Sequence, residues 1–235
     1  MGYLERYVDG EYEQTWAELQ NLGAAVREEP FYTEARLVAN ETMRRVRRNC
    51  ERIVGRLRSM GYRFDIYPDG SDRIFTFGPL AAPDDTLRSD METLEQAAGP
   101  IPISLVAFWE QVGSVDLIGM GPSWPTELDP LVVDPPTAGV SELDEMDFQL
   151  EDRGHFEVSL APDVFMKDLV SGGAAYAVKL PDPAMDFRFR NERHELLFVP
   201  YLRLALVRYG GFPGLEGRTD ALPALPLLTE GLEPF

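Results

Sequence analysis

The stretch that decides the fold is residues 99–119, GPIPISLVAFWEQVGSVDLIG. After two prolines its apolar residues lie three and four apart, as on one face of a helix; they are Leu105, Val106, Phe108, Trp109 and Val112. Gly113 follows the last of them, where a helix often ends in the left-handed conformation that glycine adopts without strain. Val115, Leu117 and Ile118 are expected to begin a buried strand. A helix that ends at a glycine and enters a hydrophobic strand is a core unit, not a catalytic motif.

Two helical patterns precede this unit, at residues 11–29 and 32–60, and Pro30 separates them. They predict an antiparallel helical hairpin. The apolar stripe of the second pattern is Val46, Cys50, Ile53, Val54, Leu57 and Met60. Seven arginines cover its other faces: Arg44, Arg45, Arg47, Arg48, Arg52, Arg56 and Arg58. Because glutamates of the same segments offset much of this charge, we expect a solvated face or a seam with acidic residues elsewhere in the chain, rather than a nucleic-acid site.

The chain between the hairpin and the core unit contains the predicted domain boundary. Residues 64–66 and 74–77 are strand-like and flank the turn sequence PDGSD. The linker PLAAPDDTL then divides residues 1–79, a helical hairpin with a short β extension, from residues 80–235, a compact α+β core. The next helix is expected to run from about Ser89 to Gly99, with Ser89 and Glu92 at capping-box spacing.

The second half of the chain alternates short strands and turns. Strands are predicted at residues 131–133, 155–160, 174–181 and 187–190, with a short helical turn at 165–170. A helix is predicted at residues 197–209, where Gly210 and Gly211 end it. The last residues, ALPALPLLTEGLEPF, are expected to pack along the body as an extended tail.

The charge of the chain is strongly acidic and unevenly distributed. Its formal net charge is −18, from 40 acidic and 22 basic side chains. Residues 1–62 hold ten of each, so residues 63–235 carry the whole surplus. Such a field repels nucleic acid and anionic membranes and speeds encounter with a basic protein, although solubility alone is an equally good reason for it.

The residues that usually carry catalysis or bind metals are scarce. Only His155 and His194 are present, outside zinc-ligand spacing, with Cys50 as the single cysteine. Neither a phosphate-binding glycine loop nor a GxSxG elbow occurs. We therefore expect no metal, no cofactor and no catalytic residue. The sequence also contains no signal-peptide pattern and no apolar run long enough to span a membrane, so a cytoplasmic protein is expected.

The candidate binding residues are acidic and aromatic. The run SELDEMDFQLEDR, residues 141–153, predicts a short amphipathic helix or loop with an acidic face. It lacks the spacing of a calcium loop, which favours a partner-binding face. Trp124, in a proline-rich loop, either packs or anchors a partner. The predicted partner-binding residues are Trp124, Glu142, Asp144, Glu145, Asp147, Glu151 and Asp152.

Residues 91–119, METLEQAAGPIPISLVAFWEQVGSVDLIG, resemble the SUKH superfamily of Smi/Knr-like domains. The matching residues are Leu94, Pro102, Phe108, Trp109, Gly113 and Val115. The sequence YLRLALVRYGGFPGLE, residues 201–216, is similar to the terminal helix and GGFPG stop of bacterial relatives, so the resemblance covers residues 80–216. Ser114 departs from the commoner pattern, which has a second glycine there.

The resemblance implies an α+β domain, with a mainly antiparallel sheet flanked by helices, and a non-enzymatic role. Many bacterial members look like immunity proteins that neutralise toxin domains, often nucleases, whereas eukaryotic members are regulatory scaffolds. The first hypothesis is therefore an immunity protein whose acidic surface occupies a basic toxin domain. The second is a scaffold that forms a homodimer through the stripe from Val46 to Met60. The third is an enzyme that uses His155 and neighbouring carboxylates.

Overall fold

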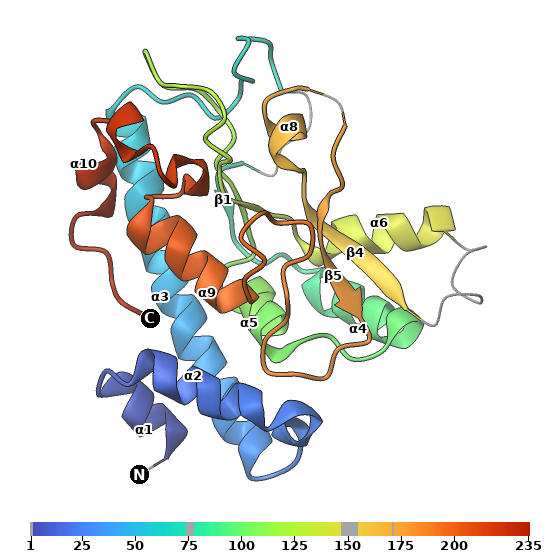
Figure 1. Cartoon of the computed structure of the whole chain (residues 1–235). Helices are drawn as coiled ribbons and strands as arrows, with labels where there is room; N and C mark the ends of the chain where they lie inside the picture. Colours follow the sequence, from blue (N-terminus) through green and yellow to red (C-terminus); the bar gives the residue numbers. More distant parts are fainter. Residues whose placement is uncertain (1, 74–77, 147–154, 171) are drawn as a thin grey trace.

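The computed structural model describes residues 2–73, 78–146, 155–170 and 172–235 (Figure 1). It is an α+β fold in which helices surround two small antiparallel sheets. This confirms the predicted fold class, including the helical N-terminal segment. The predicted strand at residues 74–77 lies outside the described residues.

The N-terminal segment is a helical hairpin preceded by one extra helix. Helices α1 (Tyr3–Val8) and α2 (Tyr12–Asn21) and the 3-10 turn η1 (Gly23–Arg27) lead into α3 (Phe31–Ser59). Pro30 stands directly before α3, as its sequence position predicts. The expected stripe is buried from Val46 to Leu57. Because these side chains are covered by the chain's own core, they are not available for the dimer contact that the second hypothesis requires.

The long helix α3 passes beside the rest of the molecule and packs against α5 (Ile103–Gln111) (Figure 1). One cluster of buried side chains extends from Tyr7 to Phe235 and includes residues on both sides of the predicted boundary at 79–80. The two parts therefore share a hydrophobic core. Whether residues 80–235 fold alone stays a prediction.

The core unit has the predicted form. Helix α5 ends at Gln111, and Gly113 follows two residues later, with a φ of +85° and an N–H that donates to the carbonyl of Phe108. A Cβ at this position would lie 2.3 Å from the backbone oxygen of Ala81, so the glycine is also needed for close packing. The following strand, β2 (Ser114–Asp116), is the middle of a three-stranded sheet between β1 (Leu80–Ala81) and β3 (Val132–Val133).

The start of α4 (Leu87–Ala98) differs from the prediction. The Asp84 carboxylate accepts hydrogen bonds from the N–H groups of Thr86 and Leu87, at 3.0 and 3.1 Å. Because a carboxylate in the linker already satisfies these free donors, the helix begins before Ser89, and the predicted Ser89–Glu92 capping box is wrong.

The second sheet pairs β4 (Phe156–Ala161) with β5 (Tyr176–Leu180), and α6 (Pro136–Met146) packs against β4. The predicted strand at 187–190 makes only isolated bridges, Ala177 with Arg190 and Arg188 with Leu197. Between β4 and β5, the short helix α8 (Val164–Lys167) lies at the outer end of a protruding loop (Figure 1).

The C-terminal helix is present but changes form along its length. Helix α9 (Phe198–Leu202) continues into a π-helical segment, η2 (Arg203–Arg208), and ends at Gly210 and Gly211, both with positive φ. Two 3-10 turns follow, η3 (Pro213–Leu215) and η4 (Thr219–Ala221). The tail packs along α3 as predicted, but it is not wholly extended, because residues Leu225–Thr229 form α10. Among the described residues, none of the helices has the length and apolar character of a membrane span.

Candidate functional site

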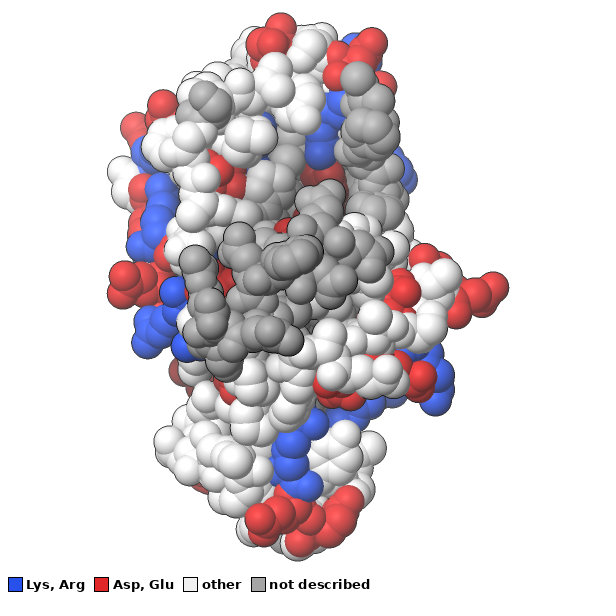
Figure 2. Space-filling model, turned by 90° about the vertical axis from the view of Figure 1, so that its right-hand side faces the viewer, with Lys and Arg blue, Asp and Glu red and all other residues white. Residues whose placement is uncertain are grey.

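The predicted acidic site is only partly described by the structure. Glu142, Asp144 and Glu145 lie on α6, whereas Asp147, Glu151 and Asp152 lie outside the described residues. The half-buried Glu142 accepts a hydrogen bond from the N–H of Ser159 at 3.0 Å and so ties α6 to β4. On the face that carries α4 and α6, acidic and basic side chains are interspersed (Figure 2). The partner-binding role of this cluster stays a prediction.

Trp124 belongs to an aromatic cluster. Its ring lies 4.8 Å from that of Tyr62 and 5.3 Å from that of Phe212 between centroids. A Cβ on Gly121 would approach the Trp124 ring to 2.6 Å, so this glycine makes room for the indole. The packing role predicted for Trp124 is confirmed, and its role as a partner anchor stays a prediction.

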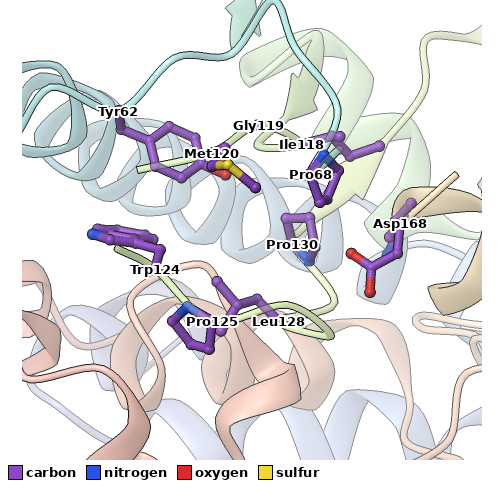
Figure 3. A pocket seen from close by; sticks show the side chains of 11 residues that line it. Tyr62, Pro68, Ile118, Gly119, Met120, Trp124, Pro125, Leu128, Pro130 and Asp168 are labelled. Carbon is purple, nitrogen blue, oxygen red and sulfur yellow. The ribbon is translucent and has the colours of Figure 1, made fainter. Parts of the chain in front are cut away.

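The space between this cluster and α8 is too small for a substrate. Tyr62, Trp124, Pro68 and Asp168 are among the residues that line a cavity of about 10 Å³ (Figure 3). A volume of this size holds a single water molecule. Because Pro68 and Asp168 both line this cavity, the turn at residues 65–72 lies beside the end of α8.

Among the described residues, α8 and the residues after it carry four of the seven large apolar side chains that are strongly exposed. Phe165 and Val170 are each 54 % exposed, and Met166 and Leu169 are each 47 % exposed. We call these four residues the α8 tip. Single exposed apolar residues are ordinary on protein surfaces, but four within six consecutive positions form a candidate interaction surface.

Lys167, the charged residue in the middle of this segment, is buried, whereas its apolar neighbours are exposed. The side chain of Lys167 is fully buried, and its Nζ lies 2.6 Å from Oδ1 of Asp129, which is also fully buried. The ammonium group lies 4.5 Å from the centre of the Tyr176 ring, and the Tyr176 hydroxyl donates to Asp129 at 3.2 Å. Burial and the neighbouring carboxylate raise the pKa of Tyr176, so it remains a neutral donor. This ion pair fixes α8 with its cation inward and its apolar side chains outward.

Backbone geometry reinforces that orientation. The Asp163 carboxylate caps α8 by accepting from the N–H groups of Phe165 and Met166, at 2.7 and 3.3 Å. Leu169 has a φ of +61°, and the N–H of Val170 donates to the carbonyl of Phe165. Asp129 also has a positive φ, +48°. Such conformations are uncommon outside glycine and persist where the surrounding contacts hold them, often at functional sites.

Carboxylates border the α8 tip. Asp168 accepts from the N–H of Glu127 at 2.9 Å, and burial raises its pKa. The Glu127 side chain is 73 % exposed and pairs loosely with Arg218 at 3.4 Å. The turn at residues 65–72, whose Pro68 lies beside the end of α8, carries three more exposed carboxylates, Asp65, Asp69 and Asp72. We call these five residues the acidic border of the α8 tip.

The other chemical groups considered from the sequence have ordinary positions. Cys50 is buried, and desolvation raises the pKa of its thiol to about 12, as expected for a core residue. His155 immediately precedes β4. Within the part of the chain that the structure describes, no three His, Cys, Asp or Glu side chains gather as metal ligands.

The arginines of α3 bind mainly to the chain itself. Arg48 and Arg52 contact the Glu233 carboxylate at 2.6 and 2.8 Å, and Arg56 donates to the carbonyls of Leu228 and Glu230. The predicted seam is confirmed, and its partner is the C-terminal tail.

Comparisons with protein-family models, curated proteins and solved structures found no match to this chain.

Proposed function

We propose that this protein is a non-enzymatic binding module that holds a basic protein partner at the α8 tip. The observation that supports this most strongly is the inverted burial of residues 165–170, where Lys167 is inside and four apolar side chains are outside. Burying a lysine with an aspartate contributes little net stability, and exposing four apolar side chains contributes none. The arrangement is explained if a partner covers those side chains.

The chemistry of the partner follows from the surroundings of the tip. The acidic border carries five carboxylates, of which Asp65 and Glu127 pair with exposed arginines. The rest of this part of the chain is also acidic, since residues 63–235 carry the whole net charge of −18. A complementary partner has an apolar pocket surrounded by lysine or arginine side chains, and its association is steered by charge and weakened by salt.

We further propose the biological role that the SUKH resemblance implies, a cytoplasmic immunity protein that neutralises a toxin domain, with a nuclease as the expected target. The observed helix–Gly–strand unit of α5 and β2 is compatible with that resemblance. The basic substrate-binding surface of a nuclease also has the charge that the acidic border would recognise.

The test is capture of partners from the cell that makes this protein, with matched surface variants. Phe165→Glu places a charge in the middle of the α8 tip. Leu227→Glu is the control, because Leu227 is 57 % exposed but lies on α10. We expect the wild type and the control to retain the same basic protein at low salt and to release it at moderate salt. Phe165→Glu should bind it at least about tenfold more weakly, the loss expected for a buried interface anchor.

Two results would contradict the proposal. One is equal binding of a basic partner by Phe165→Glu and Leu227→Glu. The other is a chain that captures only itself and whose dimer, seen by sedimentation, disappears in Phe165→Glu, since the tip would then be a self-association surface.

A further inference from the structure

Helices α2 and α9 lie away from α8 (Figure 1). Residues of α2 and of the α9–η2 segment line a second, larger recess. Its volume is about 810 Å³, within the range of small-molecule sites. The walls are mostly apolar and come from segments far apart in the sequence: Trp16, Ala17, Leu196, Pro200, Leu204 and Val207. We call this recess the α2–η2 groove.

One cation of the groove, Arg203, forms no ion pair with a described residue, although Glu13 and Asp186 also line the groove. Arg203, the first residue of η2, is partly buried, and its Nε donates to the backbone oxygen of Phe235. Its Nη2 is buried and has no hydrogen-bond partner. Among the described residues, no carboxylate side chain lies within 4 Å of its guanidinium. Burial lowers its pKa, and the more distant charges of the exposed Glu13 and of Asp186 oppose that shift only in part. A buried guanidinium with a free donor favours an anionic oxygen.

The nearby carboxylate already has its own partners. Asp186 is 2 % exposed and accepts from the N–H groups of Phe187 and Val199, each at 3.0 Å. Burial raises its pKa to about 6. The side-chain amide of Gln20 bonds both the N–H and the carbonyl of Asp186, which joins α2 to this edge of the groove. Asp186 therefore helps build the wall and leaves Arg203 as the group that would receive a ligand anion.

The chain itself shows what this end of the groove accepts. Pro234 and Phe235 line it, and the Phe235 side chain is only 3 % exposed while its backbone oxygen contacts Arg203. Phe235 therefore already combines, at this end of the groove, an apolar side chain packed on the wall and an oxygen bound to the Arg203 guanidinium. The π-helical turn of η2 places Arg203, Leu204 and Val207 along one side, and such turns are frequent at ligand sites.

We infer that the α2–η2 groove binds a small amphipathic monocarboxylate, such as a medium-chain fatty acid. The carboxylate would bind Arg203, and the chain would lie along Leu204, Val207 and Trp16. This inference is independent of the α8 tip, because the two surfaces share no residue.

Calorimetric titration of the full chain with decanoate, and with 1-decanol as the uncharged match, tests the inference. Both are used below the concentration at which they aggregate. Decanoate should bind at least about tenfold more tightly than decanol, because a charge-assisted hydrogen bond is lost in the alcohol. Arg203→Met should reduce decanoate binding to the level of decanol. Arg208→Met, the same change at an exposed arginine on the groove's edge, should change it less than about threefold.

If Arg203→Met does not fold, a variant that fills the groove provides a second test of ligand binding. Ala17 is exposed and lines the groove, so Ala17→Phe should weaken both ligands without changing the melting temperature. Phe165→Glu should bind decanoate like the wild type. Absence of decanoate binding, equal binding of decanoate and decanol, or full decanoate binding by a folded Arg203→Met or Ala17→Phe variant would overturn the inference.

Discussion

Helices α3 and α8 place their charges in opposite ways. Helix α3 has the highest density of arginine in the chain, yet most of those arginines contact the tail, α5 or glutamates of their own helix. Helix α8 has one lysine, which is buried, and its apolar residues face outward. The arginines that suggest a binding surface by composition therefore contact the chain itself, whereas the apolar side chains of α8 have no cover among the described residues.

Exposed apolar side chains without a cover are therefore a better sign of a candidate interface than charged side chains that already have partners. An arginine that already has a carboxylate and carbonyl partners gains little from a second one. An exposed phenylalanine gains free energy when anything apolar covers it.

Removing the buried cation of α8 is expected to have the largest effect. Lys167→Met leaves the fully buried Asp129 carboxylate without its counter-ion, which should lower the free energy of unfolding by about 3–5 kcal/mol. Urea unfolding at neutral pH measures it. The double variant Lys167→Met/Asp129→Asn should recover much of the loss, because no isolated charge remains and asparagine tolerates the positive φ of position 129. A loss of less than about 1 kcal/mol in Lys167→Met would show that the pair does not fix α8.

Breaking the α3 seam is expected to have a smaller effect. Glu233→Gln removes the carboxylate that Arg48 and Arg52 share, but all three side chains are partly exposed. Its cost should be about 0.5–1 kcal/mol and should shrink as salt is added. Glu230→Gln is the matched control, since this exposed residue bonds Arg56 through its backbone oxygen. Equal effects of the two variants would mean that the tail is not held by the Glu233 carboxylate.

The two regions should respond to pH with opposite signs. Hydrogen bonds from Arg48 and Arg52 and their positive charge hold the pKa of Glu233 below its usual value of 4.5. Its stabilising contribution is therefore full above that value and is lost as the pH falls through the lower folded-state pKa. Burial raises the pKa of Asp168 above 3.8, so this group destabilises the fold increasingly as the pH rises through its folded-state pKa.

Unfolding free energies measured from pH 3 to pH 7 separate these contributions. Relative to the wild type, Glu233→Gln should be less stable at pH 7, and the difference should shrink as the pH falls below 4.5. Asp168→Asn should gain stability relative to the wild type as the pH rises. The same trend in both variants would contradict the comparison.

The smallest effect on stability is expected at the α8 tip. Phe165→Ser changes an exposed side chain, so the free energy of unfolding should stay within about 0.5 kcal/mol of the wild type. Leu227→Ser provides the matched exposed position. A loss above about 1 kcal/mol in Phe165→Ser alone would show that Phe165 serves the fold, which would weaken its assignment to a partner.

Much of the fold could be predicted because its signals are local. The apolar spacing of residues 105–112 and the glycine after them specify the helix and its end within a short stretch. The capping of α4 does not follow from the helical pattern, because the capping carboxylate, Asp84, lies in the preceding linker. The π-helical part of the last helix has no distinctive spacing in its sequence.

The candidate surfaces could not be predicted in the same way. Whether Lys167 faces inward depends on Asp129, 38 residues earlier, and on the Tyr176 ring across the loop. Without that pair, residues 164–170 read as an ordinary amphipathic turn. Likewise, the α2–η2 groove joins residues more than 180 positions apart, and no local pattern connects Trp16 with Arg203.

Site-specific photo-crosslinking tests the central claim most directly. A photoreactive phenylalanine analogue would replace Phe165 in one variant and Leu227 in another, and both would be irradiated in the native cell. The account predicts a crosslink from position 165 to a basic protein, absent at position 227 and weakened by Lys167→Met. A crosslink of equal strength from position 227, or none from position 165, would contradict the claim that the α8 tip is the partner-binding surface.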